Sequence, residues 1–160
     1  MYQPQGHTRP SCWVRSNNGS IPPNAVVAGN DTSGETLFVG RAWYNQVSNF
    51  LPGKIVPSHG VCYVPFGGKE IGISEYEVLT QSPHVIYDWI SAENGQIPAG
   101  AIIGNRKENG KNDFIGRVFH QGGKIPGKIH VDHKCLYYSY AGKELSSKVY
   151  EVLVCRMIDV

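Results

Sequence analysis

The feature that most constrains this chain is an internal duplication that spans almost its whole length. Trp13 matches Trp89, and further identities follow in one register, the first copy having two extra residues before Pro52. Matches at a fixed spacing are typical of tandem structural repeats. We place the copies at residues 12–80 and 85–156, and the matched segments include Ile21-Pro22 with Ile97-Pro98, Gly40-Arg41 with Gly116-Arg117, Pro52-Gly53-Lys54-Ile55 with Pro126-Gly127-Lys128-Ile129, Gly68-Lys69-Glu70 with Gly142-Lys143-Glu144, and Tyr76-Glu77-Val78-Leu79 with Tyr150-Glu151-Val152-Leu153.

Each copy contains short apolar runs separated by turn residues, which predicts an all-β fold. Glycine (19) and proline (10) are frequent, and apolar spacing of three and four is not sustained over a helical length. Turn pairs such as Asn18-Gly19 and Asn94-Gly95 separate the runs. The expected strands are 12–15, 25–28, 37–43, 54–56, 61–65 and 75–80 in the first copy, and 86–91, 101–103, 113–119, 128–131, 135–140 and 149–156 in the second.

The link 81–84 between the copies is too short to separate two free domains. A unit of roughly 70 residues also has a marginal core by itself. We therefore expect the copies to pack around a pseudo-twofold axis as one compact domain. The last strand, which contains Val149 and Leu153, is a candidate for crossing into the other copy.

Charge and hydropathy exclude two classes of partner. The net charge is only +2 and no basic run occurs, so the chain lacks the footprint of a nucleic-acid-binding protein. No apolar stretch approaches the roughly 20 residues of a membrane helix, so we expect no membrane insertion. The first twenty residues contain no apolar segment typical of a secretory leader. The chain as encoded is therefore expected to be cytoplasmic, with unconventional secretion as the alternative.

Neither a metal centre nor an active site is indicated by the sequence. His59 lies near Cys62 and His133 near Cys135, but buried free thiols beside strand-end histidines are the simpler interpretation. A glycosidase would need two carboxylates flanking the bond, and the spacing of Asp31 from Glu70 or Glu75 does not indicate such a pair. We therefore expect no enzymatic activity, no cofactor and no bound metal.

The combination of motifs resembles the DM9 repeat over about residues 12 to 156. This family includes small two-repeat lectins of molluscs and flatworms, and the same repeats form one end of natterin-like proteins. The motifs that carry the resemblance are Trp13, Gly19, Ile21-Pro22, Ala25, Val39-Gly40-Arg41-Ala42, Pro52-Gly53-Lys54, Cys62-Tyr63-Val64-Pro65-Phe66-Gly67-Gly68 with Glu70, and Tyr76-Glu77-Val78-Leu79.

What this resemblance implies is an intertwined β-rich pair of repeats that binds mannose without a metal ion. In the lectins an acidic residue follows the turn after the second strand, and a lysine ends the Pro-Gly-Lys motif. The matching residues here are Asp31 and Lys54, and Lys128 keeps the lysine in the second copy. The acid is absent from that copy, where Asn105, Arg106 or Lys107 stands opposite Asp31.

An aspartate with a lysine suits a sugar diol. The carboxylate only accepts hydrogen bonds and the ammonium only donates them, so together they satisfy vicinal hydroxyls with charge-assisted bonds. A ring-stacking aromatic residue is also expected, and Trp43 and Tyr44 are candidates by their place in the chain. The resulting hypothesis is a mannose-binding lectin of innate immune or microbial recognition, in which a homodimer would raise the avidity of weak sites.

Other recurring residues are given structural roles. Arg41 and Arg117 are expected to pair with Glu70, Glu144, Glu77 or Glu151, and the two matched tryptophans, Trp13 and Trp89, to pack in the core or between the copies. The alternative function is an intracellular stress- or infection-response protein that uses the repeats as a protein-interaction scaffold.

Overall fold

The structure is a computed structural model that describes residues 12–158. The expectation about a leader rests partly on residues 1–11, which lie outside this range. Within it, the chain forms short strands and one 3-10 turn (Pro57–His59), with no α-helix and no helical segment able to cross a membrane. The strands are β1 Cys12–Asn17, β2 Val27–Asn30, β3 Thr36–Tyr44, β4 Asn49–Val56, β5 Val61–Phe66, β6 Lys69–Ile73, β7 Glu75–Thr80, β8 Val85–Glu93, β9 Ile103–Asn105, β10 Asp113–His120, β11 Gly123–His130, β12 Cys135–Tyr140, β13 Lys143–Ser147 and β14 Val149–Met157.

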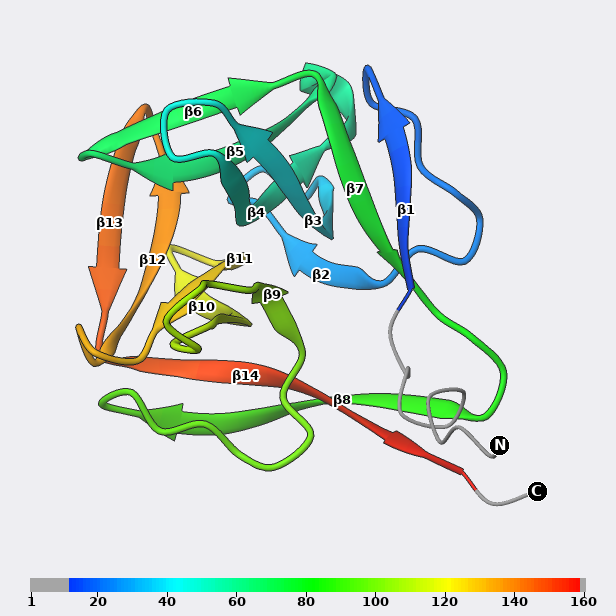
Figure 1. The fold of residues 1–160 in the computed structure, drawn as a ribbon. Helices are drawn as coiled ribbons and strands as arrows, with labels where there is room; N and C mark the ends of the chain where they lie inside the picture. Colours follow the sequence, from blue (N-terminus) through cyan, green and yellow to red (C-terminus); the bar gives the residue numbers. More distant parts are fainter. Residues whose placement is uncertain (1–11, 159–160) are drawn as a thin grey trace.

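The strand order is the same when followed from either end. The hydrogen-bonded path runs β1-β7-β3-β4-β5-β6 and continues as β13-β12-β11-β10-β14-β8, with β2 and β9 beside it. Exchanging each strand with its counterpart in the other copy converts one half of the path into the other. In Figure 1, β3 to β7 of the first copy lie above β14 and β8 of the second. The expected all-β fold and pseudo-twofold pair are confirmed.

The two copies meet through backbone pairing at two places. β6 lies against β13, where the Glu70 amide donates to the Gly142 carbonyl (3.1 Å) and the Glu144 amide donates to the Gly68 carbonyl (3.0 Å). β2 of the first copy also pairs with β11 of the second. One continuous sheet therefore connects the copies.

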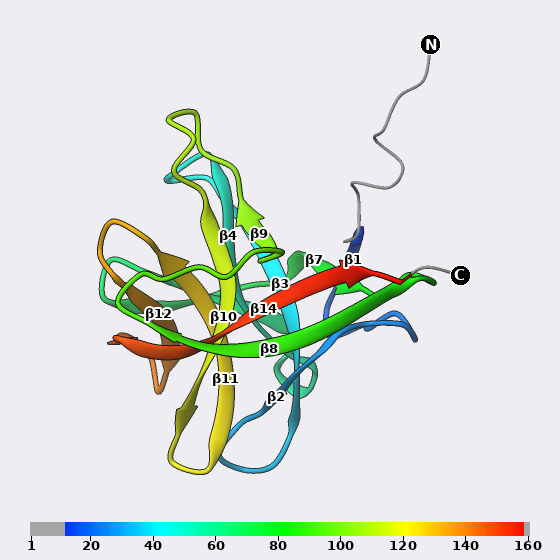
Figure 2. The same cartoon turned by 90° about the horizontal axis from the view of Figure 1, so that it is seen from below.

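The expected crossing of the last strand is wrong. β14 pairs with β8 from Val149↔Glu93 to Met157↔Val85, and with β10, and both partners belong to the second copy. In Figure 2 these two long strands run side by side. Because β8 offers a full-length partner within the same copy, β14 satisfies its backbone hydrogen bonds there.

The expected strands omitted β6 and β13, and β4 and β11 begin earlier than expected. β6 and β13 each begin with Lys-Glu and contain glycine or serine, so their apolar pattern is weak. Pro52 lies inside β4, whereas proline normally argues against a strand interior. β5 pairs with β4 only from Lys54 onward, so this proline removes no hydrogen bond from that ladder.

The apolar core is shared between the copies. Leu37 and Val56 of the first copy pack with Ile125 and Ile129 of the second, and each of the four is at most 2% exposed. A second cluster also combines residues of both copies, while a third belongs to the first copy alone. Burial of apolar side chains is the main stabilising term in folding, so neither copy has a complete core without the other.

The recurring arginines tie the copies together. Arg41 pairs with Glu77 and donates to the Gly104 carbonyl of the second copy at 2.9 Å. Arg117 pairs with Glu151 and donates to the Ala28 carbonyl of the first copy at 2.8 Å, the same arrangement in reverse. Of the four glutamates considered as partners, Glu77 and Glu151 are the actual ones.

The matched tryptophans complete these arginine sites. The guanidinium carbon of Arg41 lies 4.3 Å from the Trp13 ring centroid, and that of Arg117 lies 4.2 Å from the Trp89 centroid. Both tryptophans also pack against the core cluster shared by the two copies. Stacking on an aromatic face holds a guanidinium in a fixed plane, which explains why Trp and Arg recur together.

Candidate functional site

Lys54 is a buried cation in the middle of the molecule, not the solvated lysine that usually follows Pro-Gly. It is 6% exposed. Its ammonium lies 3.0 Å from Glu70 Oε2 and donates to the Ser139 carbonyl of the other copy at 2.7 Å. An ammonium has three N–H donors, and the third has no partner among the described residues. One donor therefore remains for a ligand.

The Pro-Gly-Lys motif has a packing reason at each residue. A Cβ on Gly53 would collide with the Tyr63 carbonyl on β5, and Pro52 lies against Gly104 of the second copy. β4 and β5 can therefore approach closely only at a glycine. This contact brings Lys54 into register with Tyr63, whose ring centroid lies 5.6 Å from the ammonium.

Asp31 lies in a tight turn directly after β2. Its Oδ1 accepts from the Ser33 amide (2.9 Å), the Ser33 hydroxyl (2.6 Å) and the Glu35 amide (3.0 Å). Slight burial would raise the pKa of Asp31, but these hydrogen bonds outweigh it and hold the pKa below its usual value. Oδ2 has no partner among the described residues, so a fixed, ionised carboxylate keeps one oxygen for a ligand.

Asp31 and Lys54 make no direct contact, and Tyr140 of the second copy lies between their neighbourhoods. The Tyr140 hydroxyl lies 3.3 Å from the Thr32 hydroxyl, next to Asp31, and its ring lies 5.8 Å from the Lys54 ammonium. The same hydroxyl donates to Gln121 at 3.5 Å. The candidate site is therefore assembled from both copies, with Asp31 and Lys54 from the first and Tyr140 from the second.

The structure identifies Lys107 as the counterpart of Asp31. The Gly34 amide donates to the Asp31 carbonyl at 3.1 Å, and the Gly110 amide donates to the Lys107 carbonyl at 3.0 Å, so the same turn follows β2 and β9. The Lys107 ammonium lies 3.1 Å from the buried Asp113 carboxylate. Among the three alternatives for this position, a cation thus replaces the acid.

Lys128 occupies the place of Lys54 but has different surroundings. It is 7% exposed, and the rings of Phe66 and Tyr137 lie 5.7 and 5.8 Å from its ammonium. No hydrogen bond or ion pair joins this ammonium to any residue between 12 and 158. Desolvation lowers the pKa of Lys128, although the negative charges of Asp113 and Glu144 act in the opposite direction and raise it.

The aromatic residues expected beside the sugar lie elsewhere. Trp43 pairs with Phe50 across the β3–β4 hairpin, about 13 Å along the strand from the Val39↔Lys54 pair at 3.3 Å per residue. Tyr44 packs on Phe66, next to Lys128. The aromatic rings beside Lys54 are Tyr63 and Tyr140, which sequence reasoning missed. Tyr63 recurs as Tyr137, whereas Tyr140 matches Phe66, so only the recurrence of Tyr63 gave a signal.

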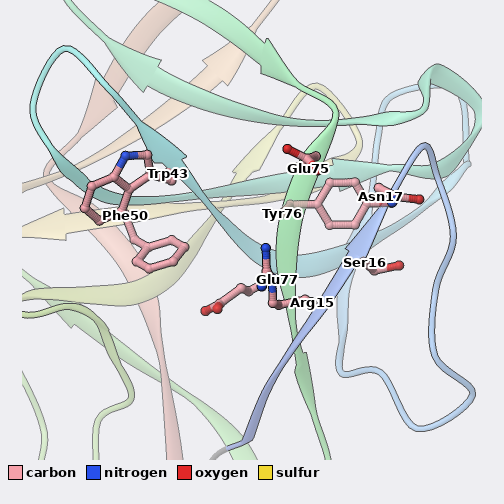
Figure 3. Close-up of a pocket in the computed structure, with 8 residues that line it drawn as sticks. All are labelled: Arg15, Ser16, Asn17, Trp43, Phe50, Glu75, Tyr76 and Glu77. Carbon is pink, nitrogen blue, oxygen red and sulfur yellow. The ribbon is translucent and has the colours of Figure 1, made fainter.

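Trp43 belongs to a separate cleft of about 670 Å³ over β1, β3 and β7, shown in Figure 3. Trp43 and Phe50 lie at one end, with Glu77 and Arg15 between them and the remaining lining residues. In the second copy Phe119 and Lys124 stand in place of the two aromatic residues, and Val149 in place of Glu75. The lining residues do not include Asp31, Lys54 or Lys128: they are Arg15, Ser16, Asn17, Trp43, Phe50, Glu75, Tyr76 and Glu77.

The histidine–cysteine pairs have local partners. His59 Nδ1 lies 2.8 Å from the Tyr63 hydroxyl, and His133 Nδ1 lies 2.8 Å from the Tyr137 hydroxyl. Cys62 and Cys135 are buried free thiols, and burial raises the pKa of the Cys62 thiol strongly. Across residues 12–158, no group of three His, Cys, Asp or Glu side chains is arranged to hold a metal ion.

Comparison with known proteins gives a family match. A model of the DM9 repeat matches residues 4–48 and 46–147. Natterin-1 of Thalassophryne nattereri is 30% identical over 142 residues, covering 88% of this chain and 37% of its own length. Natterin-4 of the same fish is 28% identical, covering 91% of this chain and 34% of its own length. The chain thus spans about a third of these curated relatives.

Among solved structures, the nematode sperm cell motility protein MFP2B has a similar fold. Its crystal structure superposes with a TM-score of 0.65 at 16% sequence identity, covering 92% of this chain and 47% of the other. At this identity the likeness concerns the fold alone.

Proposed function

Because this chain belongs to the DM9 repeat family, we propose that it is a carbohydrate-binding protein that recognises mannose or mannose-containing glycans without a metal ion. The site is formed by Asp31 and Lys54, and its role is in innate immune or microbial recognition. The observation that supports this proposal most strongly is that both side chains are held in place by the protein and each keeps one hydrogen-bonding position open.

These open positions are complementary in chemistry. Asp31 Oδ2 can only accept a hydrogen bond, and the third N–H of Lys54 can only donate one. A sugar hydroxyl does both, so neighbouring hydroxyls can bridge the two groups. Because the turn and the Glu70 pair already fix these side chains, binding costs little side-chain entropy.

Tyr140 adds an aromatic surface to this site. It is partly exposed, and its hydroxyl lies beside Thr32 in the Asp31 turn. An aromatic ring can pack against the apolar face of a pyranose while its hydroxyl stays hydrogen-bonded. Because the ring comes from the second copy, we expect binding to require both copies folded together.

The test is calorimetric titration of the full chain with mannose and a mannose trisaccharide, with EDTA present. Asp31→Asn removes the open carboxylate oxygen while keeping the size of the side chain, and Lys54→Met removes the donor. Asp132→Asn is the matched control, because Asp132 is an exposed aspartate that pairs only with Lys111 among the described residues.

We expect the unmodified chain and the Asp132→Asn variant to bind mannose with EDTA present, and Asp31→Asn to bind at least about tenfold more weakly, the loss of one charge-assisted bond. No binding of any common hexose by a folded chain would refute the proposal. Binding that depends on a metal ion would refute the site described here.

A protein-interaction scaffold is the second candidate, and exposed aromatic residues favour it. Trp43 is 48% exposed and Phe119 is 62% exposed at matching places near the ends of β3 and β10. Exposed aromatic residues are enriched at protein interfaces. Competition distinguishes the functions, because free mannose displaces a glycan-bearing partner but not one that contacts Trp43 or Phe119.

A further inference from the structure

We propose that the second copy binds a sugar that carries an anionic group, a carboxylate or a phosphate, at Lys128. This inference rests on the proposed function, since it assigns a different ligand to the counterpart of the same site. Three observations support it. The buried ammonium of Lys128 has no hydrogen-bond or ion-pair partner among the described residues, a lysine stands at the position that matches Asp31, and the nearby carboxylates are bonded to other groups.

The ammonium of Lys128 lacks the acceptors that its counterpart has. Lys54 bonds to the Glu70 carboxylate and the Ser139 carbonyl, whereas Lys128 has neither kind of partner within residues 12–158. A buried cation without an acceptor carries a large desolvation cost. A ligand that brings a negative oxygen to this ammonium removes that cost, whereas a neutral hydroxyl removes less of it.

The turn after β9 carries two lysines at the positions where the turn after β2 carries two acids. Lys107 stands in the place of Asp31, and Lys111 in the place of Glu35. No carboxylate at the Asp31 position is therefore present to accept a hydrogen bond from a sugar hydroxyl. An anionic sugar supplies its own acceptors and needs no such carboxylate.

The acids near Lys128 are already engaged. Asp113 pairs with Lys107, and Glu144 Oε1 accepts from the Gly68 amide at 3.0 Å. Asp132 pairs with Lys111 at the exposed edge of the turn. Asp113 and Asp132 thus balance the two turn lysines, and the Lys128 ammonium is the cation without a direct partner in this cluster.

Aromatic rings lie next to the Lys128 ammonium, as they do next to Lys54 in the first copy. The Tyr137 and Phe66 ring centroids lie 5.8 and 5.7 Å from the Lys128 ammonium, as those of Tyr63 and Tyr140 lie 5.6 and 5.8 Å from the Lys54 ammonium. Tyr44 packs against Phe66. A pyranose ring can therefore lie against aromatic carbon here while its charged group reaches Lys128.

The experiment titrates the full chain separately with mannose, mannose 6-phosphate, glucuronic acid and inorganic phosphate. Lys128→Met removes the charge while keeping an extended apolar side chain, and Asp31→Asn disables only the first site. Thermal melting of both variants checks that they fold. Repeating the titrations at about 50 and 500 mM salt measures the charge dependence.

We expect at least one anionic sugar to bind, to lose about tenfold or more in affinity in Lys128→Met, and to weaken with salt. Its binding should be unchanged in Asp31→Asn. Mannose 6-phosphate and glucuronic acid distinguish phosphate from carboxylate as the anion. Equal affinity for inorganic phosphate and mannose 6-phosphate would overturn the requirement for a sugar.

The two proposals fail differently. Mannose binding that depends on Asp31, with anionic sugars bound no better in the unmodified chain than in Lys128→Met, would overturn the inference alone. Anionic binding that depends on Lys128, with no mannose bound at all, would overturn the mannose proposal. A folded Lys128→Met variant that binds anionic sugars normally would overturn the assignment of Lys128.

Discussion

Glu70 joins the ammonium of Lys54 to the backbone of the other copy. Its Oε2 lies 3.0 Å from Lys54 Nζ, and its Oε1 accepts from the Gly142 amide at 2.9 Å. Glu144 reproduces only the second contact, to the Gly68 amide. The two copies therefore share the hydrogen bond to the backbone of the other copy but not the ion pair. As a result, the ammonium of Lys54 has a carboxylate partner and that of Lys128 has none among the described residues.

The Glu70–Lys54 pair should contribute strongly to folding. We expect Glu70→Gln to lower the free energy of unfolding by about 3 kcal/mol, because it leaves a buried ammonium without its charged partner. Glu144→Gln is the matched control and should cost less than about 1.5 kcal/mol, since Glu144 makes no direct ion pair among the described residues and loses only a backbone hydrogen bond and a longer-range attraction to Lys128. Urea unfolding measures both, and equal losses would contradict an ion pair in the first copy alone.

The stacked arginines should not tolerate lysine. Arg41→Lys and Arg117→Lys keep the charge but lose the planar group that stacks on tryptophan while bonding to a carbonyl of the other copy. We expect each to reduce stability by about 1–2 kcal/mol in thermal unfolding. Arg156→Lys is the control and should change stability by less than about 0.5 kcal/mol, because Arg156 is exposed.

Mannose binding should persist in mild acid. Because Oδ1 already accepts three hydrogen bonds, protonation would place a proton on Oδ2 and turn the open acceptor into a donor. The lowered pKa of Asp31 keeps the carboxylate ionised below the usual value of 3.8. As pH falls through this lowered pKa, binding should disappear. Ser33→Ala removes the 2.6 Å hydrogen bond, so the pKa should rise and the loss should begin at higher pH. Affinity measured between about pH 3 and 7 on both proteins checks this, with circular dichroism to confirm folding. An identical acid midpoint would show that Asp31 does not control binding.

The aromatic contribution should come from Tyr140 and not from Trp43. Tyr140→Ala is expected to weaken mannose binding about tenfold, because its ring lies between the Asp31 turn and Lys54. Trp43→Ala, of comparable size change, should leave it unaltered, because Trp43 lines the separate cleft over β1, β3 and β7. The reverse result in calorimetric titration would move the glycan to that cleft.

Recurrence in the sequence predicted most of the strands and the roles of the repeated residues. Trp13 with Arg41, and Trp89 with Arg117, recur because the same packing is used twice, so their structural roles could be predicted before their contacts were known. The strands β6 and β13 were missed since Lys-Glu starts and small residues give no clear alternation. The expected crossing of β14 into the first copy is wrong, because the apolar pattern of a strand does not specify which strand it pairs with.

The site was only partly predictable for a related reason. Family resemblance points to Asp31 and Lys54, and in the structure a hydrogen bond to Ser33 and an ion pair with Glu70 hold their side chains in place. Tyr140 and Glu70 were not named as site residues, because Tyr140 comes from the other copy and Glu70 was expected to pair with arginine. Lys128 matches Lys54 in the sequence, yet its surroundings differ. Lys107 stands at the position that matches Asp31, and the Glu144 carboxylate does not come within ion-pair distance of the Lys128 ammonium.

The sequence by itself determined the duplicated all-β architecture, since alternating apolar residues, glycine turns and repeated motifs act locally and occur twice. Only the tertiary structure decided which charges meet. Hydrogen bonds and ion pairs depend on distances of a few ångströms between residues far apart in the chain, such as Lys54 and Ser139. Two copies with nearly the same motif therefore fold alike, while one buried lysine finds a carboxylate and the other does not.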